Sequence, residues 1–463
     1  MMARRPHVVI IGGGFGGLAA ARALGSAPVN VTLIDRRNHH LFQPLLYQVA
    51  TAALNPSDIA YPIRAAVATQ RNTRVLLAEA RSIDVAARHV VLDDGALDYD
   101  YLILATGATH SYFGKDWGEV APGLKSVEDA LEIRRRVFLA YEAAERESDP
   151  VAQQEWLTFV VVGGGPTGVE LAGALGEIGL HTLAKDFRSI DPTEVRVVLY
   201  EGGDRVLSAY PPKLSAAAKR SLEKRQVEVK LDTFVTDIDT RSVTVKGPGG
   251  VETIGARTVL WAAGVQASPL AADLGAPRDR AGRVEVLPDL SVPGHPEVFV
   301  IGDLAKMVMD SGEQVPGVAQ GALQGGKHVA KLIAAEARSG TATPAAQRAP
   351  FRYRDKGNMA TIGRASAVIA TKRFARHGLL AWLLWWAVHI MFLVGFRNRL
   401  LMMFHWAWSW LTFKRGARLI TGDVPRLPEI KTIGADGKVT LPAPAQAVLP
   451  ARAEQLRSET LDV

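Results

Sequence analysis

The chain of 463 residues contains no cysteine. This absence excludes disulfide bonds, cysteine zinc sites, iron–sulfur clusters and any mechanism that needs a protein thiol. The net charge is only +7, and no long run carries charge of one sign. This charge is compatible with binding to a membrane surface or to an anionic ligand, but it does not indicate nucleic-acid binding. The adjacent pair His39 and His40 is expected on a surface loop, and no metal site is predicted. Only a short apolar run follows Arg4 and Arg5, which is not typical of a signal peptide, so the start of the chain is expected to stay in the cytoplasm.

Glycine, by contrast, is abundant, and its first cluster follows a strand. Four branched apolar residues, Val8 to Ile11, predict a buried parallel strand, and an alanine-rich helix is expected after the glycines. Gly12, Gly14 and Gly17 have the G-x-G-x-x-G spacing of a turn that places a diphosphate at a helix N-terminus. Asp35 ends the next strand, about 20 residues further on, where an acid that binds ribose is expected. Together these features predict a dinucleotide-binding unit.

The same unit occurs a second time. The apolar run 159–162 precedes Gly163, Gly165 and Gly168, which have the same spacing. The next strand ends in Glu201, although the gap to this acid is longer than in the first copy. A carboxylate there accepts hydrogen bonds from ribose hydroxyls and repels a 2′-phosphate, so NADH is favoured over NADPH.

A further pair of segments supports a duplication. The segments 101–108 and 258–265 follow the two glycine motifs at similar distances, and each predicts a buried strand that ends in small residues beside a ligand. Two dinucleotide sites in one chain imply electron transfer between two cofactors, a fixed flavin and a diffusing nicotinamide. The small residues assigned to the flavin are Thr106 and Gly107, and those assigned to NADH are Ala263 and Gly264.

These motifs resemble those of the flavoproteins with two dinucleotide-binding domains, in which the first copy holds FAD and the inserted second copy holds NAD(P)H. The late segment 298–303 is similar to the second FAD motif of that superfamily, with Gly302 and Asp303 at its end. The resemblance implies an α/β fold of two Rossmann-like domains, with C-terminal amphipathic helices that anchor the chain to a membrane. The implied divisions are a first part of the FAD domain at 1–112, an NADH domain at 113–285, a second part of the FAD domain at 286–340, a membrane-association and quinone-access region at 341–422, and a loosely ordered tail at 423–463.

More specifically, the chain resembles the type II NADH:quinone oxidoreductases, which are single-subunit and do not pump protons. The resemblance rests on the segments 42–47, 168–173, 319–324 and 355–360. It implies that Pro44 and Leu45 lie beside the isoalloxazine of FAD. It also implies that two glutamines, Gln320 and Gln324, line the quinone end of the flavin, and that Lys356 and Glu170 lie close to the reaction centre.

The residue types leave two interpretations open at each of these catalytic candidates. Glu170 opens the helix after the second glycine motif, so it lies near a cofactor junction or only interacts with the helix dipole. Gln320 and Gln324 are four residues apart and share a helix face, where they bind quinone carbonyls or form an exposed polar stripe. Lys356 stabilises an anionic reduced flavin or quinone, or it is a surface charge.

Two apolar, tryptophan-rich segments near the C-terminus are the least typical of a soluble protein. The segments 379–396 and 400–413 hold six of the nine tryptophans: Trp382, Trp385, Trp386, Trp406, Trp408 and Trp410. Tryptophan favours the boundary between lipid and water. The first segment is just long enough to span a bilayer, which takes about 20 residues, but the second is too short to return. The pattern favours helices that lie in the membrane plane, with a buried core or dimer helix as the alternative.

The resulting prediction is a membrane-associated flavoenzyme that oxidises NADH through FAD and reduces a membrane quinone, ubiquinone or menaquinone, without pumping protons. A homodimer is expected, bound to the lipid surface on the cytoplasmic face of the bacterial inner membrane as a peripheral or monotopic protein. The absence of cysteine excludes thiol-dependent members of the superfamily, such as disulfide reductases. Two other functions remain open, namely an NADH-dependent reductase of a soluble redox protein and a membrane redox sensor without catalytic turnover.

Overall fold

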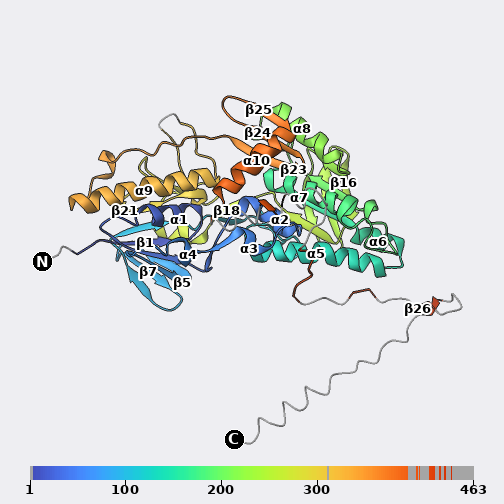
Figure 1. Cartoon of the computed structure of the whole chain (residues 1–463), viewed down its shortest axis with the longest axis horizontal. Helices are drawn as coiled ribbons and strands as arrows, with labels where there is room; N and C mark the ends of the chain where they lie inside the picture. The colour runs from blue at the N-terminus through green and yellow to red at the C-terminus, as the bar shows by residue number, and fades with distance from the viewer. Residues whose placement is uncertain are drawn as a thin grey trace, which may run out of the picture.

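The computed structural model describes residues 4–309, 312–394, 403–404, 406, 417–422, 427–428, 432–433 and 439–440. Two lobes, each built on a parallel sheet, lie side by side along the long axis of the molecule (Figure 1). The first lobe combines the N-terminal segment with the long helix α9, and the second is formed by the middle of the chain. The expected pair of Rossmann-like domains is therefore confirmed.

The sheet of the first lobe has the strand order β20-β21-β9-β1-β2-β5, in which only β20 is antiparallel to its neighbour. Its central strand is almost completely buried because both faces are covered, as expected of a parallel sheet. Helix α1 packs on α9 so closely that a Cβ on Gly326 would lie 2.2 Å from the carbonyl oxygen of Gly16. The elements are β1 (His7–Ile11), α1 (Phe15–Ala23), β2 (Asn30–Asp35), β5 (Thr73–Leu77), β9 (Tyr101–Leu104), β20 (Ser291–Val292), β21 (His295–Val300) and α9 (Ala319–Ser339).

Shorter elements complete the first lobe. Strands β6 (Ala80–Asp84), β7 (His89–Leu92) and β8 (Ala96–Asp98) form an antiparallel meander. The remaining short elements are β3 (His39–Leu41), α3 (Pro56–Ile59), β4 (Ala60–Pro62), α4 (Ile63–Ala66), β19 (Val284–Glu285), η5 (Gly302–Leu304) and β22 (Ala305–Lys306). Between β3 and α3, η1 (Gln43–Leu45) and α2 (Leu46–Ala50) instead bury their apolar side chains in the core of the second lobe.

The sheet of the second lobe has the order β13-β12-β11-β17, and all four strands are parallel. An antiparallel meander of β14, β15 and β16 covers one of its faces and α5 and α7 pack against the other, each face closed by its own buried apolar cluster. The elements are α5 (Val127–Arg146), α6 (Pro150–Trp156), β11 (Thr158–Val162), α7 (Pro166–Glu177), β12 (Arg196–Tyr200), α8 (Pro212–Glu223), β13 (Val227–Lys230), β14 (Phe234–Ile238), β15 (Ser242–Gly247), β16 (Gly250–Gly255) and β17 (Thr258–Trp261).

The chain crosses between the lobes on two short strands, β10 (Ala108–His110) and β18 (Val265–Ala267), which pair antiparallel. After β18, the side chains of Leu270, Leu274 and Val284 are buried in the core of the first lobe. The return to the first lobe therefore occurs near residue 267. The expected boundary at 285 is too late, because the apolar residues of this stretch cover the first sheet rather than the second.

The C-terminal region is a three-stranded antiparallel sheet followed by a helix: β23 (Asn358–Gly363), β24 (Ser366–Ala370), β25 (Ala375–Gly378) and α10 (Leu379–Phe392). The sheet docks on the second lobe, where a Cβ on Gly173 of α7 would lie 2.4 Å from the carbonyl oxygen of Ile362. Helix α10 lies at the junction of the two lobes (Figure 1). Among the described helices, none combines the length and the hydropathy that a membrane span requires. Most of the predicted second apolar helix and of the tail at 423–463 lies outside the described residues.

Candidate active site

The first glycine turn connects β1 to α1, and its three glycines are required for different reasons. Gly12 has a φ of +103°, and a Cβ there would lie 2.4 Å from the carbonyl oxygen of Ala105. A Cβ on Gly17 would lie only 1.8 Å from the carbonyl oxygen of Gly12. A Cβ on Gly14 would meet no described atom within 4 Å. Packing thus explains the first and third glycines, whereas Gly14 faces open space that a diphosphate at the N-terminus of α1 can fill.

The second glycine turn, between β11 and α7, repeats this geometry. Gly163 has a φ of +106°, and its Cβ would lie 2.6 Å from the carbonyl oxygen of Ala262. A Cβ on Gly168 would again lie 1.8 Å from the oxygen of the first glycine, and one on Gly165 would meet no described atom within 4 Å. The two turns are therefore equivalent supports for a diphosphate.

An acidic residue stands beside each turn. Oδ2 of Asp35 accepts the amide hydrogen of Gly13 at 2.6 Å, and Oε2 of Glu201 accepts that of Gly164 at 2.5 Å. In both acids the other oxygen accepts the amide two residues further along the chain, at 2.7 Å. These bonds fix each carboxylate at the end of its strand, and its remaining lone pairs are available to ribose hydroxyls. The structure thus brings both predicted acids to their turns.

The other residues predicted to hold FAD lie after β9 and β21 of the first sheet and in η1. The hydroxyl oxygen of Thr106 is buried and has no hydrogen-bond partner within the described part of the chain, which suits a phosphate or hydroxyl of FAD. Gly107 and Gly302 both have positive φ, at +66° and +72°, and Asp303 follows in η5. Two other predicted FAD contacts, Pro44 and Leu45, form η1, where Leu45 is completely buried. The chain therefore offers a site that fits FAD.

Ala263 and Gly264, assigned to NADH, connect β17 to the crossover strand β18. The carbonyl oxygen of Gly264 accepts the amide hydrogen of Ser111 at 3.2 Å, and a Cβ on Gly264 would lie 2.8 Å from the Phe113 ring. Gly264 therefore lets the two crossover segments pack together beside the second glycine turn.

Glu170 lies in the first half of α7, below the second glycine turn. Desolvation by the surrounding protein raises the pKa of its carboxyl to about 8, against a smaller opposing effect of the Thr361 amide, which lies 3.4 Å from Oε1. Glu170 is consequently protonated at neutral pH. Burial also raises the pKa of the neighbouring Tyr210, and the charge of Glu170 adds to that shift. A partly buried carboxyl that holds a proton near pH 7 can serve as a proton donor.

The two predicted glutamines lie on one face of α9 and both bind the backbone of a single segment. Gln324 accepts the amide hydrogen of Arg354 at 2.9 Å and donates to its carbonyl oxygen at 3.0 Å. Gln320 accepts the amide hydrogen of Lys356 at 3.2 Å and donates to the carbonyl oxygen of Gly357 at 3.0 Å. The glutamines thus fix the segment that carries Lys356, whose ammonium lies 5.7 Å from the ring centroid of Phe392 at the end of α10. A direct contact of either glutamine with a quinone stays a prediction.

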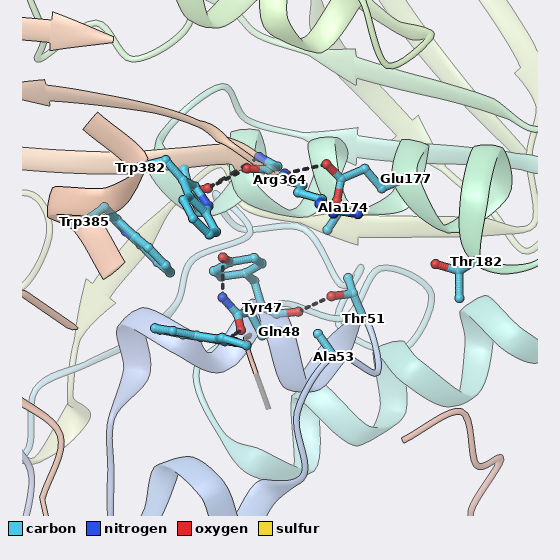
Figure 2. A pocket seen from close by; sticks show the side chains of 13 residues that line it. Tyr47, Gln48, Thr51, Ala53, Ala174, Glu177, Thr182, Arg364, Trp382 and Trp385 are labelled. Atoms are coloured by element: carbon cyan, nitrogen blue, oxygen red, sulfur yellow. Dashed lines mark hydrogen bonds between the residues drawn. The ribbon is translucent and has the colours of Figure 1, made fainter. Parts of the chain in front are cut away.

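A cavity of about 110 Å³ lies between α2, α7, β23 and α10 (Figure 2). Trp382 and Trp385 of α10 form one side, and Tyr47 and Gln48 of α2 face them. The complete lining is Tyr47, Gln48, Thr51, Ala53, Ala174, Glu177, Thr182, Thr361, Gly363, Arg364, Trp382, Trp385 and Trp406. Sequence reasoning missed this cavity, although Tyr47 ends one of the segments that carry the family resemblance. The lining is aromatic with a few polar groups, as is typical of a site for a small ring compound.

Two of the tryptophans expected at the lipid boundary are instead buried against this cavity. Only 2% of Trp385 and 9% of Trp406 is exposed, and their ring centroids lie 5.5 Å apart. The expectation for these two residues was wrong because α10 turns one face, with Ala381, Trp385 and His389, towards the protein, and Trp406 packs on Trp385 and donates to Gln48.

The structure also corrects the expectation for His40. Its side chain is buried in β3, and Nδ1 lies 3.0 Å from the carbonyl oxygen of Gly13. Burial lowers the pKa of His40, so the ring packs in its neutral form under the first glycine turn.

Residues 6–326 match the family "Pyridine nucleotide-disulphide oxidoreductase", which covers both glycine turns. The type II NADH:quinone oxidoreductase Ndh of Mycobacterium tuberculosis is 48% identical to this chain over 94% of the chain and 95% of the relative. The chain belongs to the type II NADH:quinone oxidoreductases. A second protein of this family from the same organism, NdhA, is 47% identical over 91% of the chain and 90% of the relative.

The C-terminal region also carries the signature of the type II family, since residues 356–415 match the "NDH2 C-terminal domain". This match begins at Lys356 and includes α10. The structure of NDH2 from Plasmodium falciparum in complex with NADH has a TM-score of 0.81, is 19% identical, and covers 90% of this chain and 100% of its own. The two-domain fold of this type II enzyme therefore resembles that solved structure along most of its length.

Proposed function

We propose that the protein is a membrane-associated flavoenzyme that oxidises NADH through FAD and reduces a membrane quinone without pumping protons. The single observation that carries this proposal is the position of α7. Its N-terminus is the second glycine turn, its first half carries the protonated Glu170, and its far end lines the aromatic cavity through Ala174 and Glu177. One helix thus connects the site for a dinucleotide to a cavity suited to a ring compound. The names of both mycobacterial relatives agree with this assignment.

The residues of the chain have separate tasks in this reaction. The turns at Gly14 and Gly165 hold two diphosphates by backbone amides, and Asp35 and Glu201 bind ribose. FAD, when bound, supplies the two-electron chemistry that a chain without cysteine cannot perform with thiols. Glu170 holds a proton at its carboxyl near the path between the two sites and can donate it when quinone is reduced to quinol. The protein contributes binding, orientation and proton supply.

The outer face of α10 supports a position at the lipid surface. Leu379, Leu380, Leu383 and Met391 are all exposed, and Leu380 has 57% of its surface open. A contiguous apolar face on a helix of 14 residues, about 21 Å long, suits a helix that lies in the membrane plane. The opposite face of the same helix lines the cavity, so a quinone that leaves the bilayer beside α10 has a short path. This face favours a membrane quinone over a soluble redox protein as acceptor.

We retain four finer expectations as part of this proposal. The first lobe binds FAD and the second binds NADH, with the division revised to residue 267. The molecule is a homodimer on the cytoplasmic face of the membrane. The quinone is ubiquinone or menaquinone. Glu201 favours NADH over NADPH, since a carboxylate beside the second glycine turn repels a 2′-phosphate.

The test is an assay of the FAD-loaded protein with phospholipid vesicles that contain a quinone. We expect NADH to bleach the flavin absorbance and quinone to restore it, at a steady rate that rises when vesicles are present. Ferricyanide, a small soluble acceptor, is the control for flavin reduction. Flavin that is reduced by NADH and reoxidised by ferricyanide but by no quinone would contradict the proposal. Vesicle-independent turnover with a small redox protein would support the soluble-acceptor alternative.

A further inference from the structure

The indole of Trp385 is a buried donor without an acceptor. Only 2% of the residue is exposed, and Nε1 has no hydrogen-bond partner in the described part of the chain. Trp385 also lines the aromatic cavity (Figure 2). Buried polar groups are almost always paired in folded proteins, and one that is left unpaired beside a cavity therefore points to a partner from outside the chain.

The surroundings hold this indole in one position. The His389 ring stacks on Trp385 with centroids 4.3 Å apart, and Nδ1 of His389 lies 2.7 Å from the Trp385 carbonyl oxygen. Burial lowers the pKa of His389 to about 4, so the stacked ring is uncharged at neutral pH. Trp406 packs against Trp385 on the cavity side. The N–H of Trp385 is thus pre-oriented, which reduces the entropy lost when a ligand binds it.

Several neighbouring polar groups of the cavity have partners within the chain. Nε1 of Trp406 donates to Oε1 of Gln48 at 2.8 Å, and Nε2 of Gln48 donates to the Tyr47 hydroxyl at 2.7 Å. Oε1 of Glu177 accepts from the Arg225 guanidinium at 3.0 Å and from the Arg364 amide at 2.5 Å. This network shapes the walls and leaves the Trp385 N–H as an unpaired donor.

We propose that the Trp385 indole N–H donates a hydrogen bond to a carbonyl oxygen of the quinone head group, which lies in the cavity among the rings of Trp382, Trp385 and Trp406. The inference rests on the proposed function and assigns a specific binding residue to it. A cavity of about 110 Å³ is somewhat smaller than the engineered apolar cavity of about 150 Å³ that holds benzene, so it suits at most one ring of the head group. A quinone carbonyl is an acceptor and a planar ring fits between indoles, so the ligand matches the site in both shape and polarity.

The test compares two single-ring ligands that differ only in their carbonyl groups, 2-methyl-1,4-benzoquinone and toluene. Their equilibrium binding to the oxidised, FAD-loaded enzyme is measured for the wild type, for Trp385→Phe and for Trp386→Phe. Trp386 is the next residue of α10, is partly buried, and is not among the residues that line the cavity, so it provides a matched control. We expect Trp385→Phe to weaken benzoquinone binding by about 3- to 10-fold, the loss typical of one neutral hydrogen bond, while toluene binding stays at the wild-type level.

The steady-state readout is a higher KM for quinone in Trp385→Phe, with the KM for NADH and the rate with ferricyanide unchanged. Equal weakening for both ligands, or unchanged quinone binding in Trp385→Phe, would overturn the inference, because the indole would then contribute packing or nothing. Failure of the proposed function is a separate result. In that case the wild type binds the quinone with the expected dependence on Trp385 but does not reduce it.

Discussion

Replacement of Glu170 by glutamine tests whether α7 carries a proton at neutral pH. The two side chains have nearly the same size, but glutamine cannot titrate. Desolvation raises the pKa of Glu170 from 4.5 to about 8 in the folded protein. Below pH 4.5 both the folded and the unfolded chain hold the proton. Between 4.5 and about 8 only the folded chain holds it, so the free energy of unfolding falls as pH rises, and the loss is complete above the folded pKa.

The magnitude follows from this interval. One pKa unit corresponds to about 1.4 kcal/mol, so the interval from 4.5 to about 8 accounts for at most about 5 kcal/mol of unfolding free energy. The difference in stability between wild type and Glu170→Gln should therefore shift towards the variant by up to about 1.4 kcal/mol for each pH unit within this window. Because no other titrating group is altered, the rest of the pH dependence cancels in the difference.

The assay is urea unfolding of the FAD-saturated proteins at several pH values between about 5 and 8, followed by tryptophan and flavin fluorescence. Glu142→Gln, a substitution at an exposed position of α5, is the control and should leave the pH dependence unchanged. Parallel pH profiles for wild type and Glu170→Gln would refute the reasoning, since Glu170 would then be ionised in the folded protein. In turnover, the rate with quinone should fall near pH 8 in the wild type only, while the rate with ferricyanide, which accepts no proton, should not change between the two.

Five further substitutions separate the parts of the site. Gly14→Ala and Gly165→Ala should both fold, since each added Cβ meets no described atom within 4 Å and φ is near −68°. The first variant should lose FAD binding and the second only NADH binding. Loss of the same cofactor in both variants would contradict the assignment of FAD to the first turn and NADH to the second. Glu201→Gln should raise the KM for NADH by about 10-fold or more, as expected for a lost charge-assisted hydrogen bond. The ratio of the KM for NADPH to the KM for NADH should become smaller. An unchanged ratio would argue against ribose binding by Glu201. Leu380→Glu should reduce co-sedimentation with vesicles without affecting the ferricyanide rate, and full retention of vesicle binding would exclude this face of α10 as the contact. Gln320→Leu should lower the rate with quinone more than the rate with ferricyanide, because it removes the two hydrogen bonds that hold the backbone of Lys356 and Gly357. Wild-type rates with both acceptors would show that these two hydrogen bonds are dispensable for catalysis.

Residues close together in the chain were the easiest to interpret. The strand, turn and helix around Gly12 form within about 15 residues, so spacing alone predicts how the glycines are used. Asp35 and Glu201 could be placed for the same reason, because each ends the strand next to its turn and the carboxyl ends of parallel strands share one edge. The absence of cysteine limited the chemistry without any knowledge of the fold.

Features that depend on distant contacts were not readable in the same way. The boundary at residue 267 is set by Leu270 and Leu274, which are as apolar as residues of either domain, and only packing shows which core they cover. His40 belongs to a short strand whose burial depends on α1 and the first glycine turn. The amides of Gln320 and Gln324 find their partners more than 28 residues later in the chain, so neither periodicity nor spacing indicates them.

The sequence by itself determined the two glycine turns, their acids and the exclusion of thiol chemistry, because these properties reside in single residues or in short covalent spacings. Only the tertiary structure decided which face of α10 meets the protein, and therefore that Trp385 and Trp406 line a cavity rather than lipid. A helix that is apolar all round carries no periodic signal to distinguish these faces. Its orientation is set by the docking of β23–β25 on α7 and α8, which brings together segments more than 140 residues apart, such as Ser221 and Ser366.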